Sequence, residues 1–191
     1  MIYKKVTDKE ALRIRNDIFI QNVVPILEEK GFMKSPFKTG NFGSCSDNHI
    51  FIYDMCRLRN NGILEFVTAK ISGYDRYMKI YINAFKLCPN IQSLHELNEI
   101  DDTLFHICPN NKKEMWIDVD FIVGPPLFSK DFWFNCLILK KSFTEKGHKK
   151  NIEELKKKAI AKVENIDLFF GKWYERHHPN VTTWNGEPYN M

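Results

Sequence analysis

The sequence predicts an α+β fold, in which an antiparallel β-sheet of about five strands packs against an N-terminal helix and a long C-terminal helix. Three observations support this prediction. Strand-forming segments follow one another through the middle of the chain, and helical periodicity is confined to its two ends. Strands that run between terminal helices are typical of α+β folds and not of alternating α/β folds. The short connections between successive strands make them antiparallel neighbours.

The N-terminal helix is predicted over residues 8–30, where apolar residues recur mostly three and four positions apart. Thr7 or Asp8 is suited to cap its first turn, because a short side chain with an oxygen accepts hydrogen bonds from the free backbone amides. Gly31 is suited to end the helix, since glycine enters the left-handed backbone region without steric cost. Pro25 has no amide hydrogen, so we expect it to kink the helix or to split it one turn earlier.

A meander of strands is predicted next, after a loop at residues 33–48. Residues 50–58 and 63–71 are both rich in strand-forming residues. The Asn-Asn-Gly sequence at 60–62 favours a type I′ turn between them, because both central residues of that turn take positive φ. A third strand is expected over residues 77–87.

The second half of the chain contains weaker strand signals and the clearest helix. We expect a short helix at residues 91–97, a half-buried strand at 115–123 and a further strand at 132–139. The strand at 115–123 alternates apolar and polar residues, as a strand with one solvated face does. The C-terminal helix is predicted over residues 150–177, where a continuous apolar stripe is accompanied by glutamates that precede lysines by four residues.

These elements predict a single α+β domain over residues 1–178, followed by a polar tail at 179–191 that either docks through Trp184 and Tyr189 or is disordered. The chain has 191 residues, of which 43% are hydrophobic and 27% charged, and this excludes a disordered composition. The charged N-terminal segment leads us to expect no secretory signal, and no apolar run reaches the ~18 residues that a membrane span requires. We therefore expect a cytoplasmic protein with reduced cysteines and no membrane contact.

Asp118 and Asp120 are the strongest candidates for metal ligands. Carboxylates two positions apart on a strand point to the same side, and their oxygens suit Mg²⁺ or Mn²⁺. Glu114 is expected on that face as well, at the edge of the strand. The alternative interpretation is that these carboxylates mark the solvent-exposed side of a half-buried strand, which is the commoner situation.

The lysines from Lys140 to Lys162 are candidates for contacts with a phosphate backbone. Glutamates are interleaved with them and arginine is absent, so a solvated helix face is the favoured interpretation. The formal net charge of +4 is too mild to indicate nucleic acid on its own, so a nucleic-acid partner is disfavoured. The glycine loop at 40–43 lacks the ending of a phosphate-binding loop, and no cofactor is expected.

The chain carries four short segments, at residues 27–32, 80–83, 131–134 and 169–176, that are similar in order and character to segments of one family. That family is an uncharacterised bacterial domain of unknown function (family 4304). The resemblance implies a bacterial protein with a binding role, as an immunity or accessory protein. It also implies candidate binding residues in the last two segments, which are Trp133, Trp173, Tyr174 and Arg176.

Our first hypothesis on function is a non-catalytic domain that binds another protein, because no catalytic motif emerges from the residues. Two alternatives stay open. One is a metal-dependent hydrolase or nuclease that uses Asp118 and Asp120, with Glu114 in support. The other is nucleic-acid binding through the lysines between residues 140 and 162.

Overall fold

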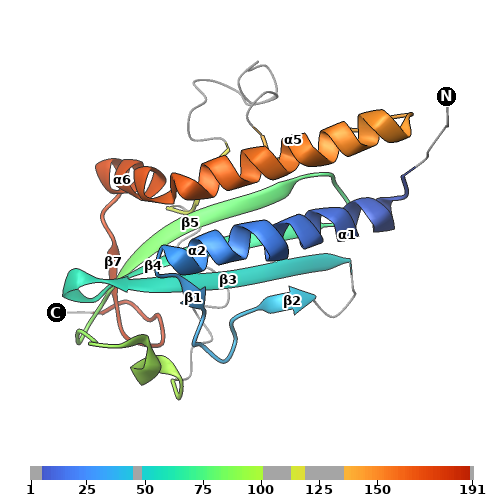
Figure 1. Cartoon of the computed structure of the whole chain (residues 1–191). Coiled ribbons are helices and arrows are strands. Elements are labelled where there is room, and N and C mark those ends of the chain that lie inside the picture. The colour runs from blue at the N-terminus through green and yellow to red at the C-terminus, as the bar shows by residue number, and fades with distance from the viewer. Residues whose placement is uncertain (1–5, 45–48, 101–112, 119–135, 190–191) are drawn as a thin grey trace.

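The computed structural model describes residues 6–44, 49–100, 113–118 and 136–189. Within them the chain forms an antiparallel sheet with helices across one face (Figure 1), so the predicted α+β fold is confirmed. The centre of the sheet consists of long antiparallel neighbours, in the order β3 (Ile50–Arg59), β4 (Ile63–Ser72) and β5 (Met78–Leu87). These strands correspond to the three segments that are richest in strand-forming residues.

Short strands extend the sheet on both sides. On one side, β1 (Met33–Lys34) and β2 (Phe42–Ser44) pair with β3, and on the other β6 (Met115–Trp116) pairs with β5. The last strand, β7 (Asn180–Thr182), also pairs with β5 but runs parallel to it. The Trp184 indole N–H donates a hydrogen bond of 2.6 Å to the carbonyl of Pro89, so the tail docks on the domain as far as residue 189.

The N-terminal helix is split where Pro25 removes an amide hydrogen. It consists of α1 (Asp8–Ile18), a π-helical turn η1 (Phe19–Val23) and α2 (Val24–Glu29). The Val24 amide bonds to the carbonyl of Phe19, five residues back, which is the π-helical pattern. Thr7 caps α1 by accepting a hydrogen bond of 3.2 Å from the amide of Glu10. The predicted cap and split are both confirmed.

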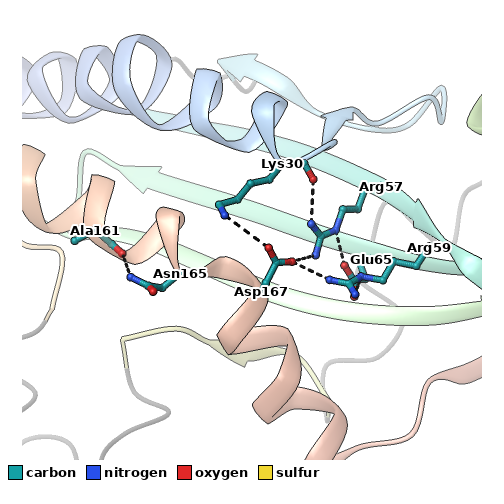
Figure 2. A network of polar contacts seen from close by, with 7 residues as sticks. All are labelled: Lys30, Arg57, Arg59, Glu65, Ala161, Asn165 and Asp167. Atoms are coloured by element: carbon teal, nitrogen blue, oxygen red, sulfur yellow. Dashed lines mark hydrogen bonds and ion pairs between the residues drawn. The ribbon is translucent and has the colours of Figure 1, made fainter.

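Gly31 ends α2 with φ at 82°, a conformation that strongly favours glycine. Its amide bonds to the carbonyl of Glu28 at 2.9 Å, and the amide of Phe32 bonds to Leu27 at 3.0 Å. These two bonds form a Schellman motif. The motif turns the chain sharply. Lys30 lies at the end of the helix, next to the sheet (Figure 2), and Phe32 enters the core.

The C-terminal helix is longer than predicted and is divided into α5 (Glu145–Glu164) and α6 (Ile166–Arg176). It starts earlier because Thr144 caps it, with its hydroxyl accepting from the amide of Gly147 at 3.1 Å. The division falls at Asn165, whose side-chain amide bonds back to the carbonyl of Ala161 at 2.7 Å (Figure 2). This competition with the helical backbone changes the direction of the chain and begins α6.

The turn between β3 and β4 differs from the prediction. Arg59 pairs with Ile63, so the loop contains Asn60, Asn61 and Gly62 and forms a short 3-10 turn. Gly62 has φ at 70°, as the left-handed last residue of a three-residue hairpin loop does. The predicted connection through residues 60–62 is therefore confirmed, whereas the predicted type I′ geometry of the turn is wrong.

Other predicted elements are shorter than expected. The helix expected at 91–97 is a 3-10 helix at η3 (Leu94–Leu97), capped by Ser93. The strand expected at 115–123 is observed only as β6. Residues 117 and 118 form a turn, and residues 119–135 lie outside the described part of the chain. Of the strand expected at 132–139, the described residues form an isolated bridge between Ile138 and Tyr77.

The core is divided between the two faces of the sheet. The larger cluster fills the space between the helices and the sheet and includes Leu27, Phe170 and Trp173, each completely buried. The smaller cluster lies on the opposite face, where Leu94 and Leu97 of η3 pack against Phe66 and Phe85. None of the helices in the described residues is long and apolar enough to cross a membrane.

Candidate functional site

An ion-pair cluster lies on the helix side of the sheet, next to the β3–β4 turn, and its centre is the carboxylate of Glu65 (Figure 2). Arg57 stands directly opposite Glu65 in the hairpin, and its Nε lies 2.6 Å from Glu65 Oε2. Glu65 Oε1 is 2.9 Å from Arg59 Nε and also accepts a hydrogen bond of 2.7 Å from the hydroxyl of Tyr174. Glu65 has an exposed fraction of 0%, so three donors replace the water it lost on folding.

Asp167 of α6 forms the second half of the cluster. Its Oδ1 accepts hydrogen bonds from Arg57 Nη2 and, at 2.8 Å, from Arg59 Nη2. Its Oδ2 lies 3.6 Å from Lys30 Nζ. We call these six residues the arginine–carboxylate cluster: Lys30, Arg57, Arg59, Glu65, Asp167 and Tyr174. They come from the C-cap of α2 and from β3, β4 and α6, so the cluster joins the two terminal helices to the hairpin.

Arg57 is the most restrained cation of the cluster. Its Nη1 donates a 3.0 Å hydrogen bond to the carbonyl of Lys30, which the helix end leaves without an intrahelical partner. Its guanidinium carbon lies 4.3 Å from the ring centroid of Phe32 and 5.6 Å from that of Phe170. These cation–π contacts and hydrogen bonds hold the guanidinium in a single position.

A pocket of about 560 Å³ opens beside the cluster and is lined by Arg57, Leu58, Arg59, Asn60, Ile63 and Tyr174. Arg59 lies at its solvent side, with 45% of its side chain exposed. Two of the three nitrogens of its guanidinium, Nε and Nη2, are held by Glu65 and Asp167. The third, Nη1, has no hydrogen-bond or ion-pair partner among the residues that the structure describes. The pocket is thus lined by a fixed guanidinium with unused N–H donors.

Tyr174 and Asp167, two titratable groups of the cluster, have shifted pKa values that do not suit them to proton transfer. Burial raises the pKa of the Tyr174 phenol, and the hydrogen bond to Glu65 raises it further. Burial opposes ionisation of Asp167, but Arg57, Lys30 and Arg59 together hold its pKa below the usual value. Near neutral pH the phenol therefore stays protonated and the carboxylate stays ionised. Neither group is suited to exchange a proton with a ligand.

The lowered pKa of Asp167 predicts a contribution to stability that is lost in acid. The ionised carboxylate stabilises the folded state above the unfolded-state pKa of about 3.9, and this stabilisation disappears as the pH falls through the folded-state value. With 48% of the side chain exposed, solvent screening limits the effect of D167N to about 1 kcal/mol at neutral pH. Urea unfolding of both proteins from neutral to acid pH should show this difference shrinking below about pH 4. A difference that is constant with pH would contradict the ion pairing of Asp167.

The proposed metal ligands are placed differently from the prediction. Asp118 is 1% exposed, so the interpretation of this residue as part of a solvent-exposed face is wrong. Its Oδ1 lies 2.9 Å from Lys162 Nζ, and its Oδ2 accepts a hydrogen bond of 2.8 Å from the amide of Leu137. Glu114 is half-buried, and Asp120 lies outside the described residues. In the described part of the chain, no group of three or more His, Cys, Asp or Glu side chains is arranged to hold a metal ion.

The ion pair of Asp118 and Lys162 connects α5 to the segment that follows β6. We therefore expect the effects of substituting these two residues on stability to be coupled. Burial raises the pKa of Asp118 although Lys162 opposes the shift, so the carboxylate depends on the lysine for its charge. We expect D118N and K162M each to lower the free energy of unfolding by about 2 kcal/mol, because each leaves a buried partner unsatisfied. In a double-mutant cycle measured by denaturation, the loss of unfolding free energy in the double variant should be clearly smaller than the sum of the losses in the two single variants. Strict additivity would show that the two side chains do not interact.

The four residues implied by the family resemblance have separate positions. Tyr174 belongs to the arginine–carboxylate cluster and lines the pocket. Trp173 is completely buried, and its indole N–H donates to the carbonyl of Lys113 at 2.6 Å. Arg176 is exposed at the end of α6, and Trp133 lies outside the described residues. Of the three that lie in the described residues, the structure brings only Tyr174 to the pocket.

Two lysines of α5, Lys149 and Lys158, and the preceding Lys140 are paired with glutamates of α5. Glu154 lies 2.9 Å from Lys140 Nζ and 3.2 Å from Lys158 Nζ, and Glu145 lies 3.1 Å from Lys149. These contacts favour the interpretation of a solvated helix face over a surface for phosphate groups.

Sequence reasoning did not identify five residues of the cluster: Lys30, Arg57, Arg59, Glu65 and Asp167. A usable signal was present in β3, where Tyr53 and Met55 face the helices and the alternation continues to Arg57 and Arg59. Charged residues at core-facing positions of a strand require partners, and this points to a buried ion-pair network.

Comparison of the chain with family models, curated proteins and solved structures finds no match. The resemblance to the domain of unknown function therefore stays a prediction, and the functional argument depends on the geometry of the pocket.

Proposed function

We propose that this chain is a non-catalytic binding domain for another protein, and that the pocket beside the β3–β4 turn recognises the partner. The observation that carries the proposal is the position of Arg59. Glu65 and Asp167 hold its Nε and Nη2, and its Nη1 is left to donate to a bound molecule. A donor that is already fixed loses little conformational entropy on binding.

The chemistry of the pocket supports binding over catalysis. Glu65 is completely buried and its carboxylate is occupied by Arg57, Arg59 and Tyr174, so it is not available as a general base. The phenol of Tyr174 has a raised pKa and donates its proton to Glu65. What the pocket offers a ligand is therefore hydrogen-bond donors and apolar surface.

The composition of the surface around the pocket supports a protein partner. Arginine and tyrosine are the residue types that most often dominate the energy of protein–protein interfaces. Leu168 follows Asp167 on α6 and has an exposed fraction of 56%, which adds apolar surface close to the cluster. Glutamates are interleaved with the lysines of α5 and pair with Lys149 and Lys158, which does not favour a nucleic-acid backbone as the partner.

The proposal includes an immunity or accessory role in a bacterial cell, which is what the family resemblance implies. A cytoplasmic location is part of it, supported by the free thiols of Cys56, Cys88 and Cys136. Burial raises the pKa of the Cys56 thiol, so this residue is unreactive in the core.

The proposal is tested by affinity capture from the native cells after nuclease treatment, with the tagged wild-type chain, R59E and R13E. Arg13 is the matched control, because 83% of its side chain is exposed and it lies on α1, outside the cluster. We expect one stoichiometric protein to be retained by the wild type and R13E and to be lost from R59E. A partner that R59E retains equally would place recognition elsewhere, and the absence of any partner would contradict a protein-binding function.

A further inference from the structure

We infer that the pocket receives a single carboxylate from a glutamate side chain of the partner, bound by the Nη1 group of Arg59 and the side-chain amide of Asn60. This inference deepens the proposed function and rests on it. The proposed function gives the location of the pocket and a protein as the partner, and this inference adds the chemical group that the pocket recognises.

The geometry of Arg59 is the first support. A guanidinium is planar and carries five N–H donors in a rigid arrangement that matches a carboxylate. Glu65 and Asp167 fix the plane of this guanidinium through Nε and Nη2. The two N–H donors of Nη1 therefore have a defined direction. Charge-assisted hydrogen bonds of this kind are roughly twice as strong as those between neutral groups.

The charge balance of the cluster indicates a monoanion. The cluster has three cationic and two anionic side chains, so one positive charge remains uncompensated. A carboxylate carries one negative charge and would neutralise the cluster. A phosphate group carries about −1.5 to −2 charges at pH 7 and would leave an excess of negative charge next to Glu65 and Asp167.

The walls of the pocket indicate a carboxylate on a short aliphatic stem. Leu58 and Ile63 line the pocket together with its arginine, asparagine and tyrosine residues. Both are only partly buried, Ile63 against the larger core cluster and Leu58 against the smaller one. The methylene groups of a glutamate can pack on this apolar surface while its carboxylate reaches Arg59. Removing a methylene group from water stabilises the bound state by about 0.8 kcal/mol, which favours glutamate over a free small anion such as acetate.

The inference is tested by titrating the full chain with three capped pentapeptides that differ only at the central residue, which is glutamate, glutamine or phosphoserine. Binding is followed through the ¹⁵Nε–¹H resonances of the arginine side chains. Loss of a resonance in R59K assigns Arg59, and R13K provides the matched control. We expect the glutamate peptide to shift the Arg59 resonance and to saturate at roughly millimolar concentration. The glutamine peptide should bind at least about tenfold more weakly. The response should be absent in R59K and unchanged in R13K.

Two results would overturn the inference. Tighter binding of the phosphoserine peptide would show that the pocket prefers a phosphate group. The absence of a shift at Arg59 with any peptide would show that the pocket does not bind an isolated acidic side chain. Neither result affects the capture experiment, in which the loss of a partner from R59E tests the protein-binding function separately.

Discussion

Replacing Glu65 by leucine is expected to lower the free energy of unfolding by about 3–5 kcal/mol. The side chain is completely buried, and the substitution removes the carboxylate that neutralises Arg57 and Arg59. Arg57 has 10% of its side chain exposed and cannot recover a full hydration shell in the folded state. The phenol of Tyr174 loses its acceptor at the same time. Urea unfolding of E65L and the wild type, monitored by circular dichroism, measures the difference.

Glu99 provides the matched control for this prediction. It is also paired with a cation, at 3.6 Å from Lys38 Nζ, but 91% of its side chain is exposed. We expect E99L to change the free energy of unfolding by less than about 0.5 kcal/mol, as exposed pairs contribute little. If E65L lowered the free energy of unfolding no more than E99L does, the cluster would not be stabilising the packing of the hairpin against the helices. The variant R57M/E65L should be more stable than E65L alone, because it removes the buried guanidinium whose Nε loses its acceptor in E65L.

Replacing Trp173 by alanine is expected to lower the free energy of unfolding by about 3–5 kcal/mol. The indole has an exposed fraction of 0% and packs at 5.3 Å, edge to face, against Tyr174. It also satisfies the carbonyl of Lys113 through a 2.6 Å hydrogen bond. The substitution therefore leaves a large cavity and a carbonyl without its donor. Thermal unfolding of W173A measures the loss.

The control for Trp173 is Leu168 on the same helix, which has an exposed fraction of 56%. We expect L168A to change stability by less than about 0.5 kcal/mol. W173F, which keeps most of the apolar volume but removes the indole N–H, should lie between W173A and the wild type. A small effect of W173A would contradict the placement of this residue in the core and would return it to the candidates for a binding surface.

The elements that were predictable from the sequence are those that depend on local chemistry. Thr7 caps a helix, Pro25 splits it and Gly31 ends it, and each effect is set by backbone groups within one or two turns. The break at Asn165 was not predicted, because an asparagine in a helical pattern does not show whether its side chain will bond to the preceding turn. The burial of Asp118 depends on Lys162, which is distant in sequence and adjacent only in the folded chain.

The cluster was not predicted because the turn expected within residues 60–62 does not determine which residues of the two strands face each other. A two-residue turn at Asn61-Gly62 would place Leu58 opposite Glu65, whereas the observed three-residue loop places Arg57 there. A shift of one residue turns every side chain of a strand to the other face, so the pairing of Arg57 with Glu65 depends on the length of this loop. Tyr174 was indicated by the family resemblance, but its hydrogen bond to Glu65 joins residues that are distant in sequence and meet only in the folded chain.

The most direct test of this account is the mobility of the Arg59 side chain in the free protein, measured from the arginine ¹⁵Nε–¹H resonances and their relaxation. Arg13, which is 83% exposed, supplies the internal reference for a mobile side chain. If Glu65 and Asp167 fix the guanidinium, Arg59 should show an order parameter close to that of the rigid backbone, about 0.85, and slow hydrogen exchange. An Arg59 side chain as mobile and as rapidly exchanging as Arg13 would contradict a preorganised binding group at the pocket.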